Sequence, residues 1–302
     1  MDIQNKDDFR SGFVAVIGRP NAGKSTLLNT LLGQKVLIIS DKPQTTRNRI
    51  QCILTEERGQ VIFFDTPGIH KPRHELGKYM VEVAKNTLNG VDICLYVADA
   101  SVPLGTGDEY VLSMINECKK PCFLALNKVD LLTKDEILVK IAQFSERAEF
   151  KEIVPISALQ AENTEKLLDL IFAELPQGPL YFPDDQITDQ PERFIISEMI
   201  REKILHLTRE EIPHSVAVLV EEMEEKKTLI KIRATILVER DSQKGIVIGE
   251  KGRVLKEVGR LAREDIEDLL ASKVFLELWV KVRKDWRNRP AYLKELGYNL
   301  KD

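Results

Sequence analysis

The first half of the chain alternates short apolar runs with longer stretches in which apolar residues recur at helical spacing. The apolar runs indicate buried strands, at residues 13–17, 61–64, 93–97, 123–126 and 153–156. The helical spacing predicts helices between them, at residues 23–32, 76–88, 109–117 and 164–175. Strands that alternate with helices predict an α/β fold, with a mostly parallel sheet covered by helices on both faces.

This regular alternation stops at Pro176. Residues 176–191 hold four prolines and a glycine. Because proline fixes φ and removes a backbone donor, we expect a semi-extended linker here. The expected organisation is a first domain at 1–178, a linker at 179–194 and a second domain at 195–302.

The second half has a different order of elements. A helix is expected at 197–207, followed by strands at 216–220 and 229–238. A glycine-containing turn at 249–252 precedes a long helix whose apolar residues keep a spacing of 3.6. A last strand is expected at 274–283. The order α-β-β-α-α-β predicts a small α+β domain.

Composition and charge narrow the classes of function. The formal net charge is −4, which argues against a binder that attracts nucleic acid through a global positive field. Residues 281–302, however, hold 7 basic and 3 acidic side chains, so positive charge gathers at this end. No apolar run approaches the ~20 residues of a membrane-spanning helix. We therefore expect a cytoplasmic protein with at most peripheral membrane contact.

The four cysteines give no sign of a metal site. Cys94 lies in an apolar run and is expected to be buried in a strand. Cys118 and Cys122 are four residues apart, but no nearby Cys or His completes a tetrahedral set.

Residues 18–25 fit the phosphate-binding pattern Gly-x4-Gly-Lys-Ser, between an expected strand and an expected helix. The glycines allow backbone N–H groups to face phosphate, and the helix N-terminus adds a positive dipole end. Lys24 is expected to pair with the β- and γ-phosphates, and the Ser25 hydroxyl to bind Mg²⁺. The loop and its flank supply the first candidate nucleotide contacts: Gly18, Arg19, Pro20, Asn21, Ala22, Gly23, Lys24, Ser25 and Thr26.

Three further motifs follow expected strands, where open α/β sheets bind ligands. In Asp65-Thr66-Pro67-Gly68, the carboxylate can hold magnesium through water, and the Gly68 N–H can reach the γ-phosphate. In Asn127-Lys128-Val129-Asp130, the Asp130 carboxylate accepts hydrogen bonds only, which suits the paired N1–H and N2–H₂ donors of guanine. Ser157-Ala158-Leu159 can offer an N–H to guanine O6. These motifs predict a GTP site rather than an ATP site.

These four motifs together resemble a translation-factor-class G domain, with GTP or GDP and Mg²⁺ as its implied ligands. Pro43-Gln44-Thr45-Thr46-Arg47 then resembles switch I, within a switch segment expected at 36–49. We favour Thr46 as the Mg²⁺ ligand, with Thr45 as the alternative.

The position after the Asp-x-x-Gly motif departs from Ras-like proteins, which have a water-orienting glutamine there. Here Ile69 occupies that position and cannot orient water, so slow hydrolysis is expected. Asn21 matches an asparagine that ligates K⁺ in several such GTPases. Whether Asn21 binds K⁺ or only shapes the loop stays open.

Ile248-Gly249-Glu250-Lys251-Gly252 resembles the Gly-x-x-Gly loop of a type II KH domain, which holds single-stranded RNA. The expected RNA contacts are Lys244, Gly249, Glu250, Lys251, Gly252, Arg253 and Lys256. The alternative is that the basic residues form only a solvated face. Phe275 and Trp279 are interpreted first as packing residues, and second as platforms for bases.

A P-loop G domain followed by a C-terminal type II KH domain is the layout of the Era family, and the chain is identified as a member. The resemblance covers residues 12–298. It implies a bacterial GTPase that binds the 3′ end of 16S rRNA on the 30S ribosomal subunit, assists subunit maturation and can sit peripherally at the inner membrane. We expect a monomer. The alternative is a GTPase for a protein or membrane partner whose KH-like domain binds no RNA. A role in tRNA modification lacks support, since no cofactor site is visible.

Overall fold

The computed structural model describes residues 8–42, 44–69, 74–209 and 211–298. It divides into two compact units, which are described separately. The first consists of Met1–Leu37, Thr46–Arg73 and Gly77–Asp189, and the second of Ile38–Thr45, His74–Leu76 and Gln190–Asp302. Two short segments from the first half of the sequence therefore belong to the second unit. The units are not two continuous stretches of sequence, as the expected domain boundaries assumed.

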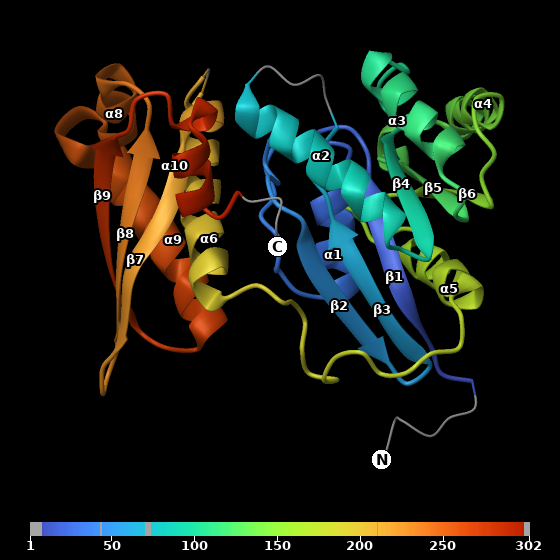
Figure 1. The fold of residues 1–302 in the computed structure, drawn as a ribbon, viewed down its shortest axis with the longest axis horizontal. Helices are drawn as coiled ribbons and strands as arrows, with labels where there is room; N and C mark the ends of the chain where they lie inside the picture. The colour runs from blue at the N-terminus through green and yellow to red at the C-terminus, as the bar shows by residue number, and fades with distance from the viewer. Residues whose placement is uncertain (1–7, 43, 70–73, 210, 299–302) are drawn as a thin grey trace. The chain divides into compact units, whose positions relative to one another are not determined.

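The first unit is built on a six-stranded sheet in the order β2-β3-β1-β4-β5-β6 (Figure 1). The strands are β1 (Arg10–Ile17), β2 (Ile50–Glu56), β3 (Gly59–Asp65), β4 (Ile93–Asp99), β5 (Cys122–Asn127) and β6 (Glu152–Ile156). Only β2 runs antiparallel to its neighbour in this sheet. The predicted mostly parallel sheet is confirmed, and β2 is an additional edge strand.

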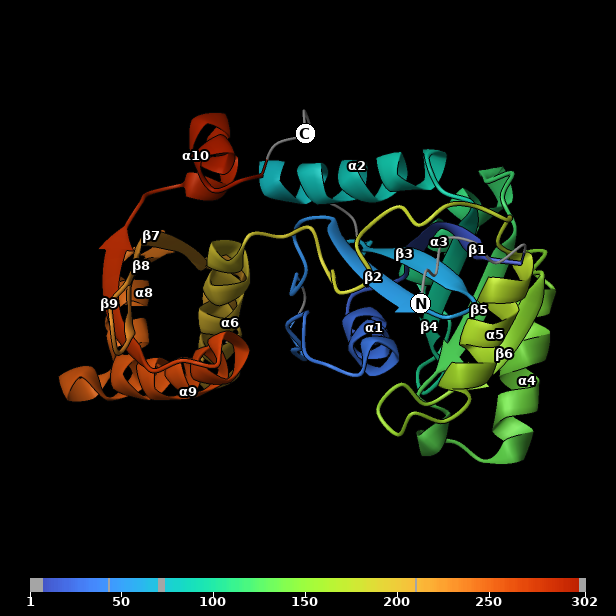
Figure 2. The same ribbon diagram turned by 90° about the horizontal axis from the view of Figure 1, so that it is seen from below.

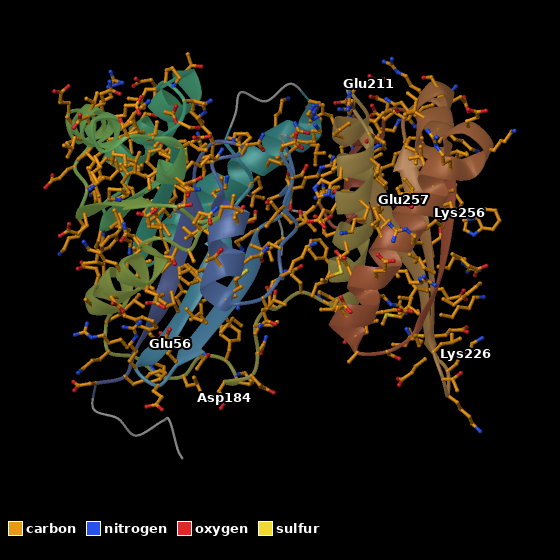
Figure 3. The ribbon with its side chains drawn as sticks, turned by 180° about the vertical axis from the view of Figure 1, so that it is seen from behind. Glu56, Asp184, Glu211, Lys226, Lys256 and Glu257 are labelled. Atoms are coloured by element: carbon orange, nitrogen blue, oxygen red, sulfur yellow. The ribbon has the colours of Figure 1, made fainter. Side chains whose placement is uncertain are left out.

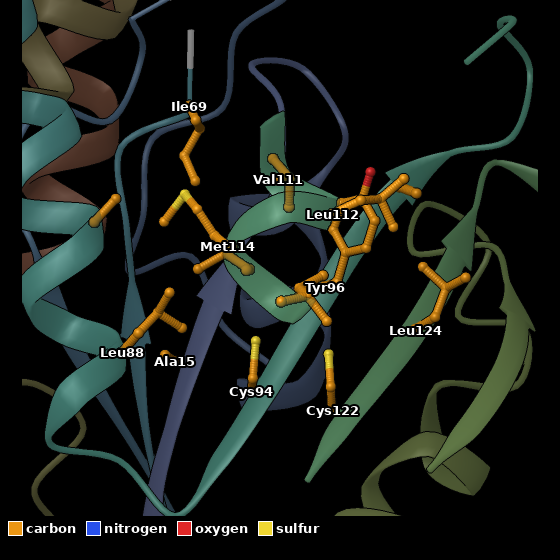
Figure 4. Packing of buried hydrophobic residues seen from close by; sticks show 14 of the residues in the cluster. Ala15, Ile69, Leu88, Cys94, Tyr96, Val111, Leu112, Met114, Cys122 and Leu124 are labelled. Atoms are coloured by element: carbon orange, nitrogen blue, oxygen red, sulfur yellow. The ribbon is translucent and has the colours of Figure 1, made fainter. Parts of the chain in front are cut away.

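Helices cover both faces of this sheet. They are α1 (Lys24–Leu32), α2 (Glu75–Asn89), α3 (Thr106–Glu117), α4 (Lys134–Ser145) and α5 (Thr164–Glu174), with a 3₁₀ turn η2 (Val129–Leu131). The core on one face joins strand residues to α2, α3 and α4, through side chains such as Cys94, Tyr96 and Met114 (Figure 4). Cys94 is fully buried in β4, as predicted. Helix α4 was not anticipated.

The predicted linker is partly fastened to the first unit. The Gln60 side chain accepts hydrogen bonds from the N–H groups of Tyr181 (2.9 Å) and Phe182 (3.0 Å) and donates one to the Phe182 carbonyl (2.9 Å). The Ser11 hydroxyl donates to the carbonyl of Pro179 at 2.7 Å. This proline-rich stretch therefore has backbone groups satisfied by side chains of the sheet.

The second unit has a three-stranded sheet in the order β7-β8-β9. Its elements are α6 (Glu192–Leu207), α7 (Ile212–Ser215), β7 (Ala217–Glu225), β8 (Ile230–Val238), α8 (Asp241–Ile248), η3 (Glu250–Gly252), α9 (Arg253–Leu270), β9 (Val274–Val282), η4 (Trp286–Asn288) and α10 (Pro290–Glu295). Strand β8 runs antiparallel to β7 and parallel to β9. The predicted α-β-β-α-α-β order is present, with α7 and α10 added.

Helices α6, α8 and α9 pack on one face of this sheet (Figure 2). Helix α9 contributes Val258, Ala262 and Ile266, which are fully buried and recur every four residues, as its amphipathic pattern requires. The sheet contributes the even-numbered residues of β8, such as Ile232 and Ile236. Among the described residues, no helix has both the length and the apolar character needed to cross a membrane.

Candidate functional site

The phosphate-binding loop connects β1 to α1, where its glycines are required by geometry. Gly18 has φ 154° and Gly23 has φ 96°, in the region that favours glycine. A Cβ atom on Gly18 would lie 2.3 Å from the Val97 carbonyl oxygen, and one on Gly23 would lie 2.2 Å from Asn127 Nδ2. Since α1 begins at Lys24, its free N–H groups lie at the end of this loop, as anion binding requires.

Lys24 is buried inside the loop. Its Nζ donates to the carbonyls of Gly18 at 3.2 Å and Arg19 at 3.0 Å. Burial lowers the pKa of Lys24 to about 8, and the nearby Asp65 carboxylate opposes this shift. A buried cation that donates to backbone carbonyls is well suited to a phosphate group, which would offset its desolvation.

Three oxygen ligands meet beside the loop. The Ser25 and Thr46 hydroxyls donate to Asp65 Oδ2 at 2.9 Å and 3.0 Å, and the two hydroxyl oxygens are 3.2 Å apart. The second oxygen, Asp65 Oδ1, is buried with no hydrogen-bond partner among the described residues. Burial raises the pKa of Asp65, while Lys24 and the two hydroxyls oppose the rise. Hard oxygen ligands around a carboxylate with an unsatisfied oxygen fit Mg²⁺.

The same geometry distinguishes the two threonines of switch I. Thr46 Oγ1 reaches the Asp65 carboxylate, whereas Thr45 Oγ1 donates to the Lys42 carbonyl at 2.6 Å. The arrangement therefore favours Thr46 as the Mg²⁺ ligand. Pro43 of the same motif lies outside the described residues.

The motif that begins at Asp65 ends against the loop. A Cβ on Gly68 would lie 2.7 Å from Pro20 N, and the Ile69 N–H donates to the Gly18 carbonyl at 3.1 Å. The Ile69 side chain is 1% exposed and belongs to the hydrophobic core (Figure 4). The position of the Ras-like glutamine is thus taken by an apolar side chain in the core. The Thr66 hydroxyl donates a hydrogen bond to the Val16 carbonyl at 2.7 Å, which fixes this motif to β1.

Asn127 joins the loop to the segment expected at guanine O6. Its Nδ2 donates to the Ala22 carbonyl at 2.8 Å, and its Oδ1 accepts the Ala158 N–H at 2.9 Å. The Ala158 carbonyl also accepts the Thr30 hydroxyl at 2.8 Å. Asn127 and Ala158 therefore hold the two loops together, and the Ser157 N–H is occupied by the Glu162 carbonyl at 3.1 Å.

Asp130 is exposed just beyond the end of β5, on the turn η2. Its carboxylate makes no hydrogen bond or ion pair within the described part of the chain, so both oxygens are available to a base. The neighbouring Lys128 pairs with Asp99, with Nζ and Oδ2 2.5 Å apart, and Val129 is buried beneath the turn. The motif thus presents one carboxylate outward from a fixed turn.

In the second unit, the Gly-x-x-Gly loop joins α8 to α9. Gly249 has φ 72° and Gly252 has φ 78°. A Cβ on Gly249 would lie 2.5 Å from Val254 Cγ2, whereas one on Gly252 would meet no atom within 4 Å. Gly249 is therefore needed for packing, and Gly252 leaves an open surface.

A groove of about 990 Å³ begins at this loop and runs between α9 and the edge strand β9. Its helical wall carries four cationic side chains and one acidic one, and its strand wall is apolar: Arg253, Lys256, Arg260, Arg263 and Glu257 on the first, and Val274, Phe275, Leu276 and Leu278 on the second. Arg260 pairs with Glu257 at 2.7 Å, so Arg253, Lys256 and Arg263 supply most of the positive charge of this wall. Glu250, Lys251 and Arg253 are exposed, whereas Lys244 and Gly252 are half-buried. Lys256 is also exposed, on α9 (Figure 3). Arg260 and Arg263 could not be predicted as part of this surface from the sequence, because only the folded structure shows that they line the groove.

The first interpretation of Phe275 and Trp279 as packing residues is wrong. Their side chains are 52% and 57% exposed. They lie on the face of β9 opposite to the buried Val274 and Val280, and strand alternation alone does not say whether that second face is covered. The basic end is partly neutralised within the unit, because Arg283 pairs with Glu295 at 2.5 Å.

Two groups of contacts around the loop and the switch segment could not be predicted from the sequence. Asn29 fixes the chain after α1, because its Oδ1 accepts the N–H groups of Val36 (3.0 Å) and Leu37 (2.9 Å). Within the second unit, Glu202 Oε1 accepts the Ile39 N–H at 2.8 Å, and Arg201 donates to the Thr45 carbonyl. Both groups depend on tertiary placement, which no local pattern reveals.

Comparisons with known proteins agree with this geometry. A family model described as 50S ribosome-binding GTPase matches residues 13–128, and a KH domain model matches residues 211–287. A crystal structure of Era in complex with MgGDPNP and nucleotides 1506–1542 of 16S ribosomal RNA is 43% identical, with a TM-score of 0.94, covering 97% of this chain and 100% of that one. A variant of Aquifex aeolicus Era bound to GDP·AlF₄⁻ is 43% identical, with a TM-score of 0.93 and the same coverage.

Proposed function

The chain belongs to the Era family, and from this premise we propose that it is a GTP-hydrolysing switch that binds the 3′ end region of 16S rRNA and assists maturation of the small ribosomal subunit. The observation that carries the proposal is the meeting of Ser25 and Thr46 on Asp65 at 2.9 and 3.0 Å, beside a buried Lys24. Such a cluster can bind the magnesium ion that accompanies GTP, and Thr46 would then link nucleotide binding to the position of the switch segment.

In this proposal, Ser25 and Thr46 would hold Mg²⁺ directly, with Asp65 holding it through water. The ion, when bound, neutralises charge on the phosphates. Lys24 pairs with the β- and γ-phosphates, and the Gly68 N–H faces the γ-phosphate. Asp130 accepts from guanine and excludes adenine. The phosphate-binding loop supplies binding and orientation, which are most of what phosphoryl transfer requires.

Hydrolysis is slow in the isolated protein, because the side chain that would orient water is replaced by Ile69, buried in the core. We propose that K⁺ supplies part of the missing positive charge. Asn21 supports this, since it is exposed at the tip of a turn closed by the Ala22 N–H and the Arg19 carbonyl (3.4 Å), and its amide oxygen suits such a cation.

Single-turnover GTP hydrolysis is expected to be about tenfold faster in K⁺ than in Na⁺ buffer, because a fixed charge near the transferring phosphoryl group stabilises its transition state. Asn21→Ala should remove this difference while retaining the rate seen in Na⁺. The measurement is the rate of phosphate release with enzyme in excess. Equal rates of the wild-type protein in the two buffers would contradict the K⁺ proposal, without affecting the GTPase assignment.

The groove beside Gly252 supports RNA as the partner. Lysine and arginine side chains on the helical wall can neutralise a phosphate backbone, and the apolar strand wall can contact unpaired bases. The groove thus combines the two kinds of contact that single-stranded RNA needs. Because the protein has a net charge of −4, it does not attract RNA through its overall charge, and RNA binding would depend on this local positive site.

Gly252→Asp is expected to weaken binding of an RNA that carries the 3′-terminal sequence of 16S rRNA by about tenfold or more, because it places a negative charge where phosphates approach. Gly252→Asn is the matched control. Asparagine and aspartate both tolerate positive φ, and neither meets an atom within 4 Å at its Cβ. The measurement is the RNA Kd at fixed salt concentration. Equal RNA affinity of the Asp and Asn variants would favour a protein or membrane partner instead.

We propose that residues 38–45 link nucleotide state to RNA binding. In the second unit this segment is held by α6, through Arg201 to Thr45 and through Glu202 and His206 to Ile39. Arg201 and Glu202 are each only 1% exposed, so these contacts replace water around two charges. Thr46 follows Thr45 directly in the chain, so ordering of Thr46 by bound nucleotide restrains the same segment.

We propose that the protein acts in the cytoplasm, where ribosomal subunits mature. Peripheral contact with the inner membrane and the monomeric state remain predictions.

A further inference from the structure

The side chain of Arg19 extends from the phosphate-binding loop onto the first turn of α3. Its Nη1 lies 2.6 Å from Asp108 Oδ2. Two glycines provide the space, because a Cβ on Gly107 would lie 3.2 Å from Arg19 Cγ and Cδ, and one on Gly105 would lie 3.4 Å from Nη1. The loop is therefore attached through this side chain to a helix that begins more than 80 residues later in the sequence.

Asp108 is itself held rigidly. Its Oδ1 accepts the Tyr96 hydroxyl at 2.9 Å, and its Oδ2 also accepts the Gly105 N–H at 2.9 Å. Asp108 is 4% exposed, and Tyr96 lies fully buried in the core of the first unit (Figure 4). The Asp108 carboxylate is therefore held in a single orientation by a core side chain and by the helix N-terminus, and it can fix the position of the Arg19 guanidinium.

The backbone of Arg19 acts at the other end of this connection. Its carbonyl accepts the Lys24 Nζ at 3.0 Å and the Ala22 N–H at 3.4 Å. One residue thus ties its side chain to α3 and its carbonyl to the lysine that is to meet the phosphates. A shift of Arg19 would move both the turn that shapes the loop and a hydrogen-bond partner of Lys24.

We propose that Asp108 is a positioning residue for GTP binding: through Arg19 it holds the phosphate-binding loop in the shape that places Lys24. The arginine side chain of this ion pair is 34% exposed and the aspartate side chain 6%. Removing either side chain therefore leaves its partner with an unpaired charge that is partly or almost wholly buried. The inference rests on GTP binding by this loop. If the wild-type protein failed to bind GTP, the proposed function would fall first.

A double-mutant cycle tests the connection, with Arg19→Met, Asp108→Asn and the double variant. Asparagine keeps the shape of aspartate and an oxygen for the Tyr96 hydroxyl, but removes the charge that Arg19 needs. Each single variant is expected to raise the Kd for GTP with Mg²⁺ by about tenfold, and the double variant also by about tenfold rather than a hundredfold. Arg19→Lys should restore most of the affinity lost in Arg19→Met.

Glu109→Gln is the matched control on the same helix. Glu109 is exposed and pairs with Arg147 at 2.6 Å, away from the loop, so its loss should leave the Kd unchanged. The unfolding temperature of the free variants is measured in parallel, because a purely structural role would lower it without changing the Kd. Since Arg19 is partly exposed, Arg19→Met keeps the test valid if Asp108→Asn does not fold. A wild-type Kd in Arg19→Met, or effects that multiply in the double variant, would overturn the proposal.

Discussion

Lys24→Ala is expected to raise the Kd for GTP by about two to three orders of magnitude, the loss of about 3 to 4 kcal/mol when one partner of a desolvated charge pair is truncated. Lys24 is the one buried cation that the described part of the loop directs inward, held by the Gly18 and Arg19 carbonyls. The measurement is equilibrium binding of a fluorescent GTP analogue in the presence of Mg²⁺.

Stability of the free protein separates this effect from misfolding. Burial lowers the pKa of Lys24 to about 8, so the charged side chain costs free energy in the folded protein at neutral pH. This cost is relieved as the pH rises through 8, because the unfolded chain then binds more protons. Lys24→Met, which keeps the length but removes the charge, should therefore unfold at an equal or higher temperature while binding GTP as poorly as Lys24→Ala. Tight GTP binding by either variant would contradict this role for the lysine.

Asp130→Asn is expected to weaken GTP by about a thousandfold and to admit xanthosine triphosphate. The carboxylate makes two charge-assisted hydrogen bonds to guanine in the proposed site, worth about 1.5 to 3 kcal/mol each. The asparagine amide presents a donor where guanine also presents one, whereas xanthine presents an acceptor there. Asp130 is exposed and makes no ion pair within the described residues, so the fold should be unaffected.

Competition among GTP, xanthosine triphosphate and ATP gives the readout for this variant. The wild-type protein should prefer GTP over both, and Asp130→Asn should prefer xanthosine triphosphate. Lys128→Ala provides a comparison, because it alters the same turn without touching the carboxylate, and should retain the preference for guanine. If Asp130→Asn still selected GTP, the proposed base contact would be wrong.

Much of the fold follows from local pattern. The strands that begin at Ile93 and Cys122 are continuous apolar runs, and such runs are typical of a sheet that is buried on both faces. Strand β2 could not be recognised from the pattern, because Gln51 and Thr55 interrupt its apolar residues. Helix α4 was missed because Leu138 and Val139 are exposed, so its apolar residues do not mark one buried face.

Part of the candidate site could also be predicted from local sequence, and part could not. Motifs that are contiguous in sequence identified the phosphate loop and the residues that follow the strands, because parallel strands bring their carboxyl ends together. The anchoring of Arg19 by Asp108 and the contacts of Ile39 and Thr45 with α6 could not be predicted. They depend on tertiary placement of residues far apart in the chain, and their sequence context is that of ordinary surface residues.

Bound nucleotide is expected to control RNA binding. The most direct test is the Kd of the full-length protein for an RNA with the 3′-terminal sequence of 16S rRNA, measured with a non-hydrolysable GTP analogue and with GDP at equal Mg²⁺ and salt concentrations. We expect RNA to bind about tenfold more tightly with the GTP analogue than with GDP. By linkage, RNA should raise the affinity for that analogue relative to GDP by the same factor. Equal RNA affinity in the two nucleotide states would contradict it.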